Sequence, residues 1–246
     1  MASKPTIIAF DAYGTLLSTS SIASKLSSHF GDSTATTIAT TWRKYQLEYT
    51  WRLNSMAAYE DFSSITLQSL KHALAESSVS LSDKDIQDLM SAYDQLSTFP
   101  DVVPALKKLK THQQNGEVKA VVFSNGTDRM VGASVRESPD LKPVADVFAE
   151  IVTVEEIKRF KPAKEVYGHL AQKVGVDKES REEMGRMWLV SGNPFDVVGA
   201  RAVGMQAAWV DRQGNGWQDQ LVQGELGRPT VICKDLEEVV DAIMKA

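Results

Sequence analysis

The sequence predicts an α/β fold: a Rossmann-like parallel sheet core with an inserted helical cap. Three observations predict this fold. Short apolar runs end abruptly in polar residues, helical patterns lie between these runs, and one long helical stretch without a strong strand signal follows the first run. Strands that alternate with helices form open sheets with right-handed crossovers. The length of 246 residues suits one such domain with a modest insertion.

The expected strands are continuously apolar, which is typical of strands buried on both faces of a parallel sheet. They cover residues 6–10, 119–123, 187–190, 206–210 and 230–232. Helices are expected where apolar residues recur at helical spacing, over 102–110, 164–174 and 196–203. Ligands of such sheets bind at the carboxyl ends of the strands. We therefore expect Asp11, Ser124 and Ser191, which each follow a strand, to meet in one crevice.

The expected cap lies between the first two strands. Three helices are predicted there, over 41–56, 62–76 and 82–96, with Ser82 as the N-cap of the third. The serine-rich residues 18–28 are interpreted as a hinge and a first cap helix. The predicted domains are therefore a core of residues 1–17 and 98–246 and a cap of residues 18–97.

The composition is ordinary for a globular protein, with 43% hydrophobic and 24% charged residues. The net charge of −5 argues against a nucleic-acid partner, because phosphates select basic surfaces. Cys233 is the single cysteine, which excludes an intramolecular disulfide and a cysteine-based metal cluster and fits a reducing compartment. The apolar run at residues 6–10 is too short for a secretory signal or a membrane span, so we expect a cytoplasmic protein without a membrane partner.

Asp11 is the candidate nucleophile. It follows the first apolar run and precedes a turn at Gly14 and a hydroxyl at Thr15, so its carboxylate lies beside free backbone N–H groups. The alternative interpretation is an aspartate that caps the next helix. The position after the first strand, with matching sites after other strands, favours the nucleophile.

Three further segments carry polar side chains toward the same crevice. Ser124 and Asn125 follow the second strand and either bind a carboxylate or phosphate or form a plain strand-to-helix turn. Lys161 precedes a helix and either pairs with Asp11, which keeps that carboxylate ionised, or is a solvated surface lysine. Asp196 either joins this cluster or is the N-cap of the following helix, or does both. One lysine offsets the repulsion between two aspartates without a metal ion.

These four blocks, in this order, resemble the haloacid dehalogenase superfamily, and the resemblance covers nearly the whole chain, including the cap. Most members resemble phosphatases, which carry a second aspartate two residues after the nucleophile to protonate the leaving alcohol. Tyr13 stands at that position here, and its reference pKa of about 10 makes it a poor acid. A halide leaving group needs no proton, and Ser191, Asn193 and a single aspartate form a poor cage for magnesium. These residues favour the dehalogenase branch, without a metal or another cofactor.

The cap supports this branch. The segment from Trp42 to Trp51 resembles the cap helix of the L-2-haloacid dehalogenases, in which the arginine, here Arg43, faces the leaving halide. The alternative for Arg43 is a solvated helix arginine. The block at residues 191–196 also resembles that family's version, with Phe195 where an aromatic residue is expected.

The resemblance implies a reaction and a set of residues. Asp11 would displace the halide from C2 of a short-chain (S)-2-haloalkanoic acid, and water would hydrolyse the aspartyl ester to give the (R)-2-hydroxy acid. The implied catalytic residues are Asp11, Thr15, Arg43, Lys161, Ser191, Asn193 and Asp196. The implied substrate-binding residues are Ala12, Tyr13, Leu47, Phe62, Ser124, Asn125, Tyr167 and Phe195, with Trp42 as a further candidate for the apolar wall.

The same resemblance assigns individual roles. The substrate carboxylate would be bound by Ser124 and by the backbone N–H groups of Ala12 and Tyr13. The departing halide would lie among Arg43, Asn125 and Phe195. Ala12 is smaller than the residue that the family often has there, which leaves the preferred chain length open.

Two other functions remain open. One is a phosphatase or phosphonatase of the same superfamily that acts on a small phosphorylated metabolite. The other is a catalytically idle member that binds a small acid, against which the intact Asp11, Lys161 and Asp196 argue. Related enzymes are often dimers through the cap, so a homodimer is a further expectation, with the aromatic helix 42–51 contributing to its surface.

Overall fold

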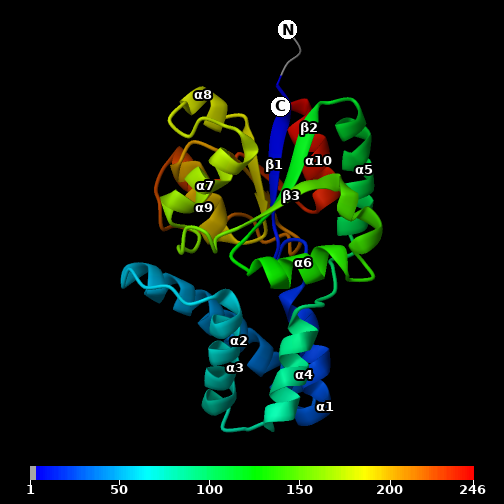
Figure 1. Cartoon of the computed structure of the whole chain (residues 1–246), viewed down its shortest axis with the longest axis vertical. Helices are drawn as coiled ribbons and strands as arrows, with labels where there is room; N and C mark the ends of the chain where they lie inside the picture. Colours follow the sequence, from blue (N-terminus) through cyan, green and yellow to red (C-terminus); the bar gives the residue numbers. More distant parts are fainter. Residues whose placement is uncertain (1–3) are drawn as a thin grey trace.

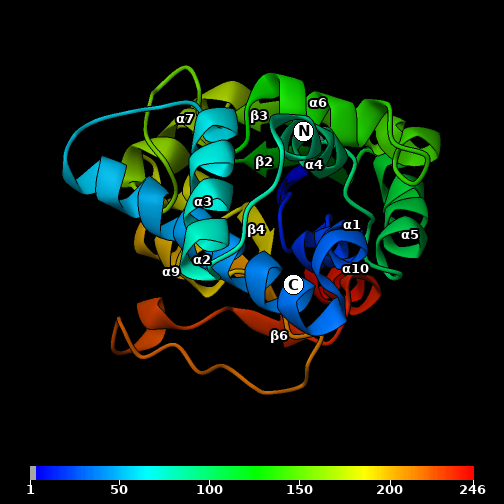
Figure 2. The same ribbon diagram turned by 90° about the horizontal axis from the view of Figure 1, so that it is seen from below.

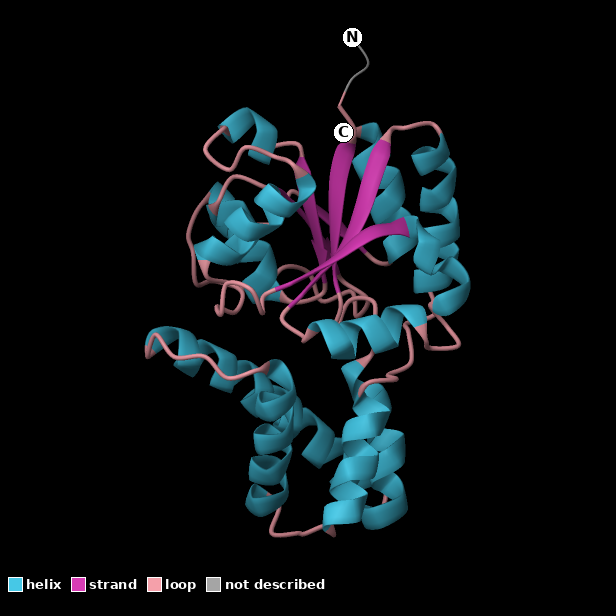
Figure 3. Cartoon of the chain, viewed as in Figure 1, coloured by secondary structure: helices cyan, strands magenta, loops and turns pink. Residues whose placement is uncertain are grey.

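The computed structural model describes residues 4–246, which form a core around a parallel sheet and a helical lobe below it in the view of Figure 1. The sheet, magenta in Figure 3, has six parallel strands in the order β3-β2-β1-β4-β5-β6. The strands are β1 (Thr6–Asp11), β2 (Val118–Ser124), β3 (Phe148–Thr153), β4 (Met187–Ser191), β5 (Gln206–Val210) and β6 (Val231–Cys233). The predicted fold class is confirmed.

The pairing register brings the carboxyl ends of the three central strands to one edge of the sheet. Asp11 stands opposite Phe123 of β2, and the residue before Asp11 stands opposite Val190 of β4. Ser124 and Ser191 therefore end their strands beside Asp11. The strand order changes direction between β1 and β4, and ligands of doubly wound sheets bind at such a switch point.

The edge strand β3 lies outside the sequence-based predictions. It contains Glu150 in its middle, and only its last two residues, Val152 and Thr153, are buried. An edge strand pairs on one side only, so its sequence lacks the continuous apolar run that indicates a central strand. The five predicted strands are confirmed, each with ends within one residue of the predicted bounds.

Helices cover both faces of the sheet. On one face α5 (Val102–Gln114) packs beside α10 (Leu236–Lys245), and on the other α7 (Lys164–Val174) packs beside α9 (Pro194–Ala202) (Figure 1). Shorter segments complete the core: α6 (Asp128–Arg136), α8 (Arg181–Met184), η2 (Lys142–Val147) and η3 (Glu225–Gly227). None of the helices in residues 4–246 has the length and apolar character that crossing a membrane requires.

The start of α9 corrects one alternative from the sequence. Asn193 is the N-cap of this helix, and Pro194 occupies its first position, where the fixed φ of proline suits a helix start. Asp196 therefore lies in the first turn and is not the N-cap. Its side chain is fully buried and contacts Lys161.

The lobe below the sheet consists of η1 (Thr19–Ile22), α1 (Ala23–Phe30), α2 (Asp32–Ser55), α3 (Phe62–Glu76) and α4 (Asp83–Tyr93). Ser82 is the N-cap of α4 as predicted, because its hydroxyl accepts from the Asp85 backbone N–H. α2 begins at Asp32, well before the predicted start at residue 41. The added segment is rich in threonine and has weak apolar periodicity, because its buried side chains are few and mostly small: Ala35, Ile38 and Ala39. Seen from below, these helices lie in front of the ends of β2 and β4 (Figure 2).

Two chain segments connect the core and the cap, and they run side by side. Leu17 and Thr98 form an antiparallel bridge, and the Ser18 backbone N–H donates to Ser97 O at 2.8 Å. The predicted boundaries between residues 17 and 18 and between residues 97 and 98 fall within this connection. The division into two domains at these residues stays a prediction.

Candidate active site

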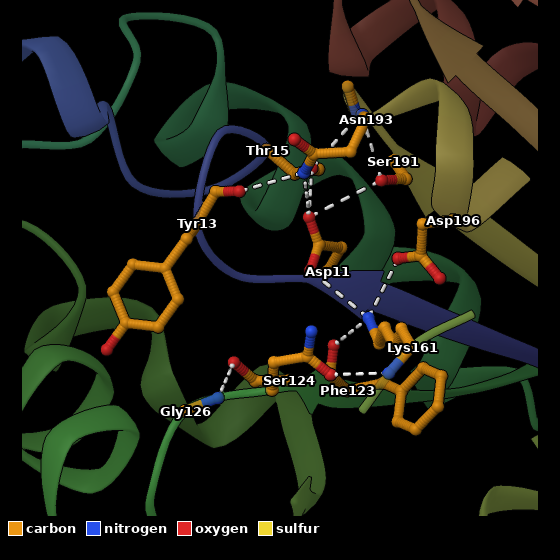
Figure 4. Close-up of polar contacts among 12 residues, drawn as sticks. Asp11, Tyr13, Thr15, Phe123, Ser124, Gly126, Lys161, Ser191, Asn193 and Asp196 are labelled. Atoms are coloured by element: carbon orange, nitrogen blue, oxygen red, sulfur yellow. Dashed lines mark hydrogen bonds and ion pairs between the residues drawn. The ribbon is translucent and has the colours of Figure 1, made fainter. Parts of the chain in front are cut away.

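Asp11 ends β1, and four hydrogen bonds fix its carboxylate (Figure 4). Oδ2 accepts from Asn193 Nδ2 at 2.7 Å, from Thr15 Oγ1 at 2.8 Å and, at a longer 3.4 Å, from Ser191 Oγ. Oδ1 accepts from Lys161 Nζ at 3.1 Å. One carboxylate oxygen is therefore surrounded by donors, while the other keeps a lone pair for a reaction.

Lys161 lies between two buried aspartates. Its Nζ is 3.1 Å from Asp11 Oδ1 and 2.8 Å from Asp196 Oδ2, and it also donates to Phe123 O at 2.7 Å. These contacts use all three N–H donors of the ammonium group. Lys161 is only 1% exposed, so the predicted pairing with Asp11 is present and the alternative of a solvated surface lysine is wrong.

Asp196 sits behind Lys161 with both carboxylate oxygens occupied. Oδ2 accepts from Lys161, and Oδ1 accepts from the Tyr167 hydroxyl at 2.8 Å. Burial raises the pKa of Asp196 from 3.8 to about 6, the charge of Lys161 opposes this rise, and the charge of Asp11 adds to it. Burial also raises the pKa of Tyr167, which keeps the phenol protonated as a donor. Tyr167 therefore supports Asp196 and is one partner removed from Asp11.

The cap contributes Arg43, which reaches from α2 to the core. Its Nη2 donates to Tyr13 O at 3.2 Å and to Asn193 Oδ1 at 3.3 Å. The Nδ2 of the same Asn193 donates to Asp11 Oδ2 and to Tyr13 O. One amide therefore connects the cap arginine to the candidate nucleophile. Arg43 is partly buried, and the alternative of a solvated helix arginine is wrong.

The structure adds Gln46 to the residues that the sequence singles out. Gln46 is fully buried in α2, and its Oε1 accepts from Arg43 Nη1 at 2.7 Å. The signal available in the sequence is the i, i+3 spacing, which puts both side chains on one side of the helix. That signal is weak, because glutamine is common on exposed helix faces.

The block after β2 lies where the sequence predicts it. Ser124 Oγ accepts from the Gly126 backbone N–H at 3.0 Å, which leaves the Ser124 O–H to donate to a ligand. Asn125 Oδ1 accepts from the Lys161 backbone N–H at 2.9 Å. Asn125 therefore fixes the loop that carries Lys161, a contact that the sequence does not predict.

Comparison with known proteins gives the family. Residues 5–204 match the family model of the haloacid dehalogenase-like hydrolases. The chain is 31% identical to (S)-2-haloacid dehalogenase H-109 from Pseudomonas putida, over 96% of this chain and 97% of that protein. It is 35% identical to (S)-2-haloacid dehalogenase 4A from Burkholderia cepacia, over 84% of this chain and 83% of that protein. The chain belongs to the (S)-2-haloacid dehalogenase family.

The fold of the solved members of this family agrees with that assignment. The L-2-haloacid dehalogenase from Xanthobacter autotrophicus with chloropropionic acid covalently bound has a TM-score of 0.81 to this chain. The two chains are 25% identical, and the match covers 98% of each. The superfamily and the branch that Tyr13 and Arg43 indicate in the sequence are both confirmed.

In this member of the family, Tyr13 and Phe62 form an aromatic side of the site. Their rings stack with centroids 5.6 Å apart, and Tyr93 packs on the Tyr13 ring at 5.7 Å. The Tyr13 hydroxyl is buried and has no hydrogen-bond partner in residues 4–246. Burial raises its pKa well above the ordinary value of 10. A phenol in this state does not replace the carboxylic acid of a phosphatase.

The remaining predicted residues lie on α2, on α9 and directly after β1. Phe195 is partly buried and packs edge-on against Trp51 of α2, with ring centroids 5.5 Å apart. Leu47 is partly buried one turn after Arg43 on α2, and Ala12 is fully buried after β1. Trp42 donates its indole N–H to Thr66 O within the cap at 2.8 Å, so it belongs to the cap core.

The charge between the two aspartates comes from an ammonium group. Within residues 4–246, no group of three or more His, Cys, Asp and Glu side chains is placed to hold a metal ion. Lys161 Nζ contacts Asp11 and Asp196 directly and offsets their repulsion. That the reaction needs no metal or other cofactor stays a prediction.

Proposed function

We propose that the protein is an (S)-2-haloacid dehalogenase that converts short-chain 2-haloalkanoic acids into (R)-2-hydroxy acids without a metal ion. The observation that carries this proposal is the connection from Arg43 through Asn193 to Asp11. Through two hydrogen bonds of Asn193, the positively charged Arg43 is linked to the carboxylate nucleophile Asp11. A cation in this position is suited to stabilising a departing anion. Two relatives of this chain are named as (S)-2-haloacid dehalogenases, and their names support the same reaction.

In the first step, a lone pair on Asp11 Oδ1 attacks C2 of the substrate from the side opposite the halogen. The carbon–halogen bond breaks, its electron pair leaves with the halide, and an aspartyl ester forms with inversion at C2. Oδ1 is suited to this attack because it accepts a single hydrogen bond, whereas Oδ2 accepts three. The step transfers no proton, so it needs no acid at Tyr13.

Two groups of side chains are assigned to the substrate in this step. We assign the substrate carboxylate to Ser124 and to the backbone N–H groups of Ala12 and Tyr13, and Ser124 keeps its O–H available as a donor. We assign the departing halide to Arg43 together with Asn125 and Phe195. The guanidinium charge stabilises the negative charge that develops on the halogen in the transition state.

In the second step, water attacks the carbonyl carbon of the Asp11 ester. The ester bond breaks, the hydroxy acid leaves, one water oxygen stays in the regenerated carboxylate and a proton is released. Thr15, Ser191 and Asn193 donate to Oδ2, the oxygen on which negative charge develops in this step. Lys161, held by Asp196, keeps its positive charge beside the regenerated carboxylate.

A halide-release assay with both enantiomers of 2-chloropropionate tests this function. We expect the wild type to release chloride from the (S) enantiomer at a rate that a chelator does not change. We expect Asp11→Asn to release no chloride as long as the new asparagine is not deamidated to aspartate. Magnesium-dependent release of phosphate from phosphorylated metabolites, without chloride release, would show a phosphatase instead. The expected cytoplasmic location and the expected homodimer through the cap stay predictions.

A further inference from the structure

Gln46 lies inside the cap at the centre of a small polar network. It is fully buried, as is Thr66 of α3, and Tyr93 of α4 is 2% exposed. Gln46 Oε1 accepts from Arg43 Nη1 at 2.7 Å and from the Tyr93 hydroxyl at 3.0 Å. Gln46 Nε2 donates to Thr66 Oγ1 at 2.8 Å. Three cap helices therefore meet at one side-chain amide, and its oxygen points toward Arg43.

The hydrogen bonds fix the orientation of this amide. Arg43 can only donate, so the oxygen of Gln46 must face it. The Thr66 hydroxyl donates to Phe62 O at 2.6 Å, so its oxygen must accept, and the amide N–H₂ of Gln46 must face it. A side chain with an acceptor at one end and a donor at the other is needed here. Of the neutral side chains of this length, glutamine alone provides both.

The partners of Arg43 share one electrostatic property. The three acceptors of its hydrogen bonds in residues 4–246 are Gln46 Oε1, Tyr13 O and Asn193 Oδ1, and all three are neutral oxygens. A carboxylate in any of these positions would neutralise the guanidinium charge. Neutral acceptors fix the position of the guanidinium and leave its charge available to an anion.

We propose that Gln46 is a positioning residue for dehalogenation: it orients Arg43 toward the departing halide without neutralising its charge. This inference rests on the proposed function. Gln46 acts through Arg43 and takes no part in bond formation or cleavage. It assists the displacement step, in which the halide leaves. It has no role in ester hydrolysis, because the halide has already left.

Two variants distinguish the orientation of Arg43 from the preservation of its charge. Gln46→Glu keeps an oxygen for Arg43 and adds a negative charge beside it, and Gln46→Met removes the acceptor without adding a charge. Gln68→Glu is the matched control, because it makes the same charge change at an exposed position of the neighbouring helix α3. The rate constants for displacement and for ester hydrolysis are measured separately in single turnovers with (S)-2-chloropropionate and (S)-2-bromopropionate.

We expect Gln46→Glu to slow displacement about 100-fold with the chloro acid and about tenfold with the bromo acid, because the poorer leaving group depends more on the cation. We expect Gln46→Met to slow displacement by a similar factor with both acids. Ester hydrolysis should change by less than about twofold in both variants, and Gln68→Glu should match the wild type.

Slower displacement and hydrolysis by the same factor, with either variant, would show that Gln46 only stabilises the cap and would overturn this inference. This inference would also be overturned if the ratio of the displacement rate constants with the chloro and bromo acids were the same in Gln46→Glu as in the wild type. If one variant does not fold, the other variant tests the inference: slower displacement with unchanged ester hydrolysis supports it, and equal slowing of both steps overturns it. If the wild type releases neither halide, the proposed function fails and this inference fails with it, whereas a failure of this inference alone leaves wild-type halide release intact.

Discussion

Arg43 of the cap and Asp11 of the core are joined by a single amide, that of Asn193. Asn193 Oδ1 accepts from Arg43 Nη2 at 3.3 Å, and Asn193 Nδ2 donates to Asp11 Oδ2 at 2.7 Å. Asn193 is the N-cap of α9 and is held by its own backbone contact to Ser191 Oγ. The position of the Arg43 guanidinium relative to the Asp11 carboxylate therefore depends on this core residue.

Replacing Asn193 by alanine should uncouple the cap arginine from the nucleophile. We expect kcat/KM for (S)-2-chloropropionate to fall about 100-fold or more, because a donor to the reacting carboxylate and a contact to Arg43 are lost together. The melting temperature should change little, because the helix start keeps Pro194. Asn115→Ala, at an exposed position after α5, is the matched control and should keep wild-type kinetics. Wild-type kcat/KM in Asn193→Ala would refute the coupling.

Replacing Lys161 by methionine should destabilise the fold in a pH-dependent way. The variant leaves Asp11 and Asp196 as two buried carboxylates without the ammonium group between them. We expect the free energy of unfolding at pH 8 to fall by about 3–5 kcal/mol, as for other buried ion pairs that lose one partner. The loss should be smaller at pH 5, where Asp196 takes up a proton.

Urea unfolding of Lys161→Met at the two pH values measures this effect. Lys164→Ala serves as the control, because Lys164 is exposed at the start of α7, and its stability should stay within about 0.5 kcal/mol of the wild type. Equal destabilisation of Lys161→Met at pH 5 and pH 8 would contradict the role of Lys161 as the counter-charge of both aspartates.

The activity should depend on the ionisation of Asp196. Burial raises the pKa of this carboxyl to about 6, so it takes up a proton as the pH falls through that value and ceases to be the ionic partner of Lys161. We expect kcat to decrease below pH about 6, and we expect Asp196→Asn to have a low kcat without this decrease. A steady-state pH profile measures both. A wild-type kcat that is constant down to pH 5 would be inconsistent with this role of Asp196.

The same shift predicts the pH dependence of stability. The pKa of Asp196 is higher in the folded protein, about 6, than the ordinary value of 3.8. Its contribution to the free energy of unfolding is therefore fully present below pH 3.8 and is lost as the pH rises through about 6. Asp196→Asn should remove this part of the pH dependence. Urea unfolding of both proteins between pH 4 and pH 8 measures it, and parallel curves would contradict the prediction.

Gly126 should be needed for the packing of Tyr13. A Cβ at Gly126 would lie 2.8 Å from the Tyr13 ring and 2.8 Å from the Val131 side chain. We expect Gly126→Ala to lower the free energy of unfolding by about 1–3 kcal/mol through overpacking and to raise KM by displacing Tyr13. Gly132→Ala is the matched control inside α6, where the nearest atom is 3.7 Å away, and it should stabilise the helix by about 0.5–1 kcal/mol. A higher free energy of unfolding for Gly126→Ala than for Gly132→Ala would contradict this packing.

The sequence predicts the central part of the fold well and its edges less well. Strands β1, β2 and β4 are continuously apolar because both faces are covered, and that pattern is visible without a structure. Strand β3 and the start of α2 are missed because their burial is partial. Glu150 interrupts the apolar run of β3, and the small buried side chains of α2, such as Ala35, carry little apolar signal.

In the site, the sequence predicts which residues converge but not how their hydrogen bonds are shared. Asp11 ends β1 and Asp196 follows β4, so the sequence predicts both at one edge of the sheet. Lys161 is predicted beside them from its place before a helix, and it contacts both. The position of Asp196 behind Lys161, with Tyr167 as its second partner, depends on the start of α9 and on tertiary packing. Gln46 is missed because burial, and not residue type, makes its amide a partner of Arg43.

The attack of Asp11 on the substrate is the central claim, and a single turnover in ¹⁸O-labelled water tests it most directly. With excess enzyme and (S)-2-chloropropionate, one labelled oxygen should appear in Asp11, detected by mass spectrometry of the peptide that contains it. The first lactate formed should be unlabelled, and the label should enter the product only in later turnovers. Labelled lactate in the first turnover, with Asp11 unlabelled, would show that water attacks C2 directly and would contradict the ester mechanism.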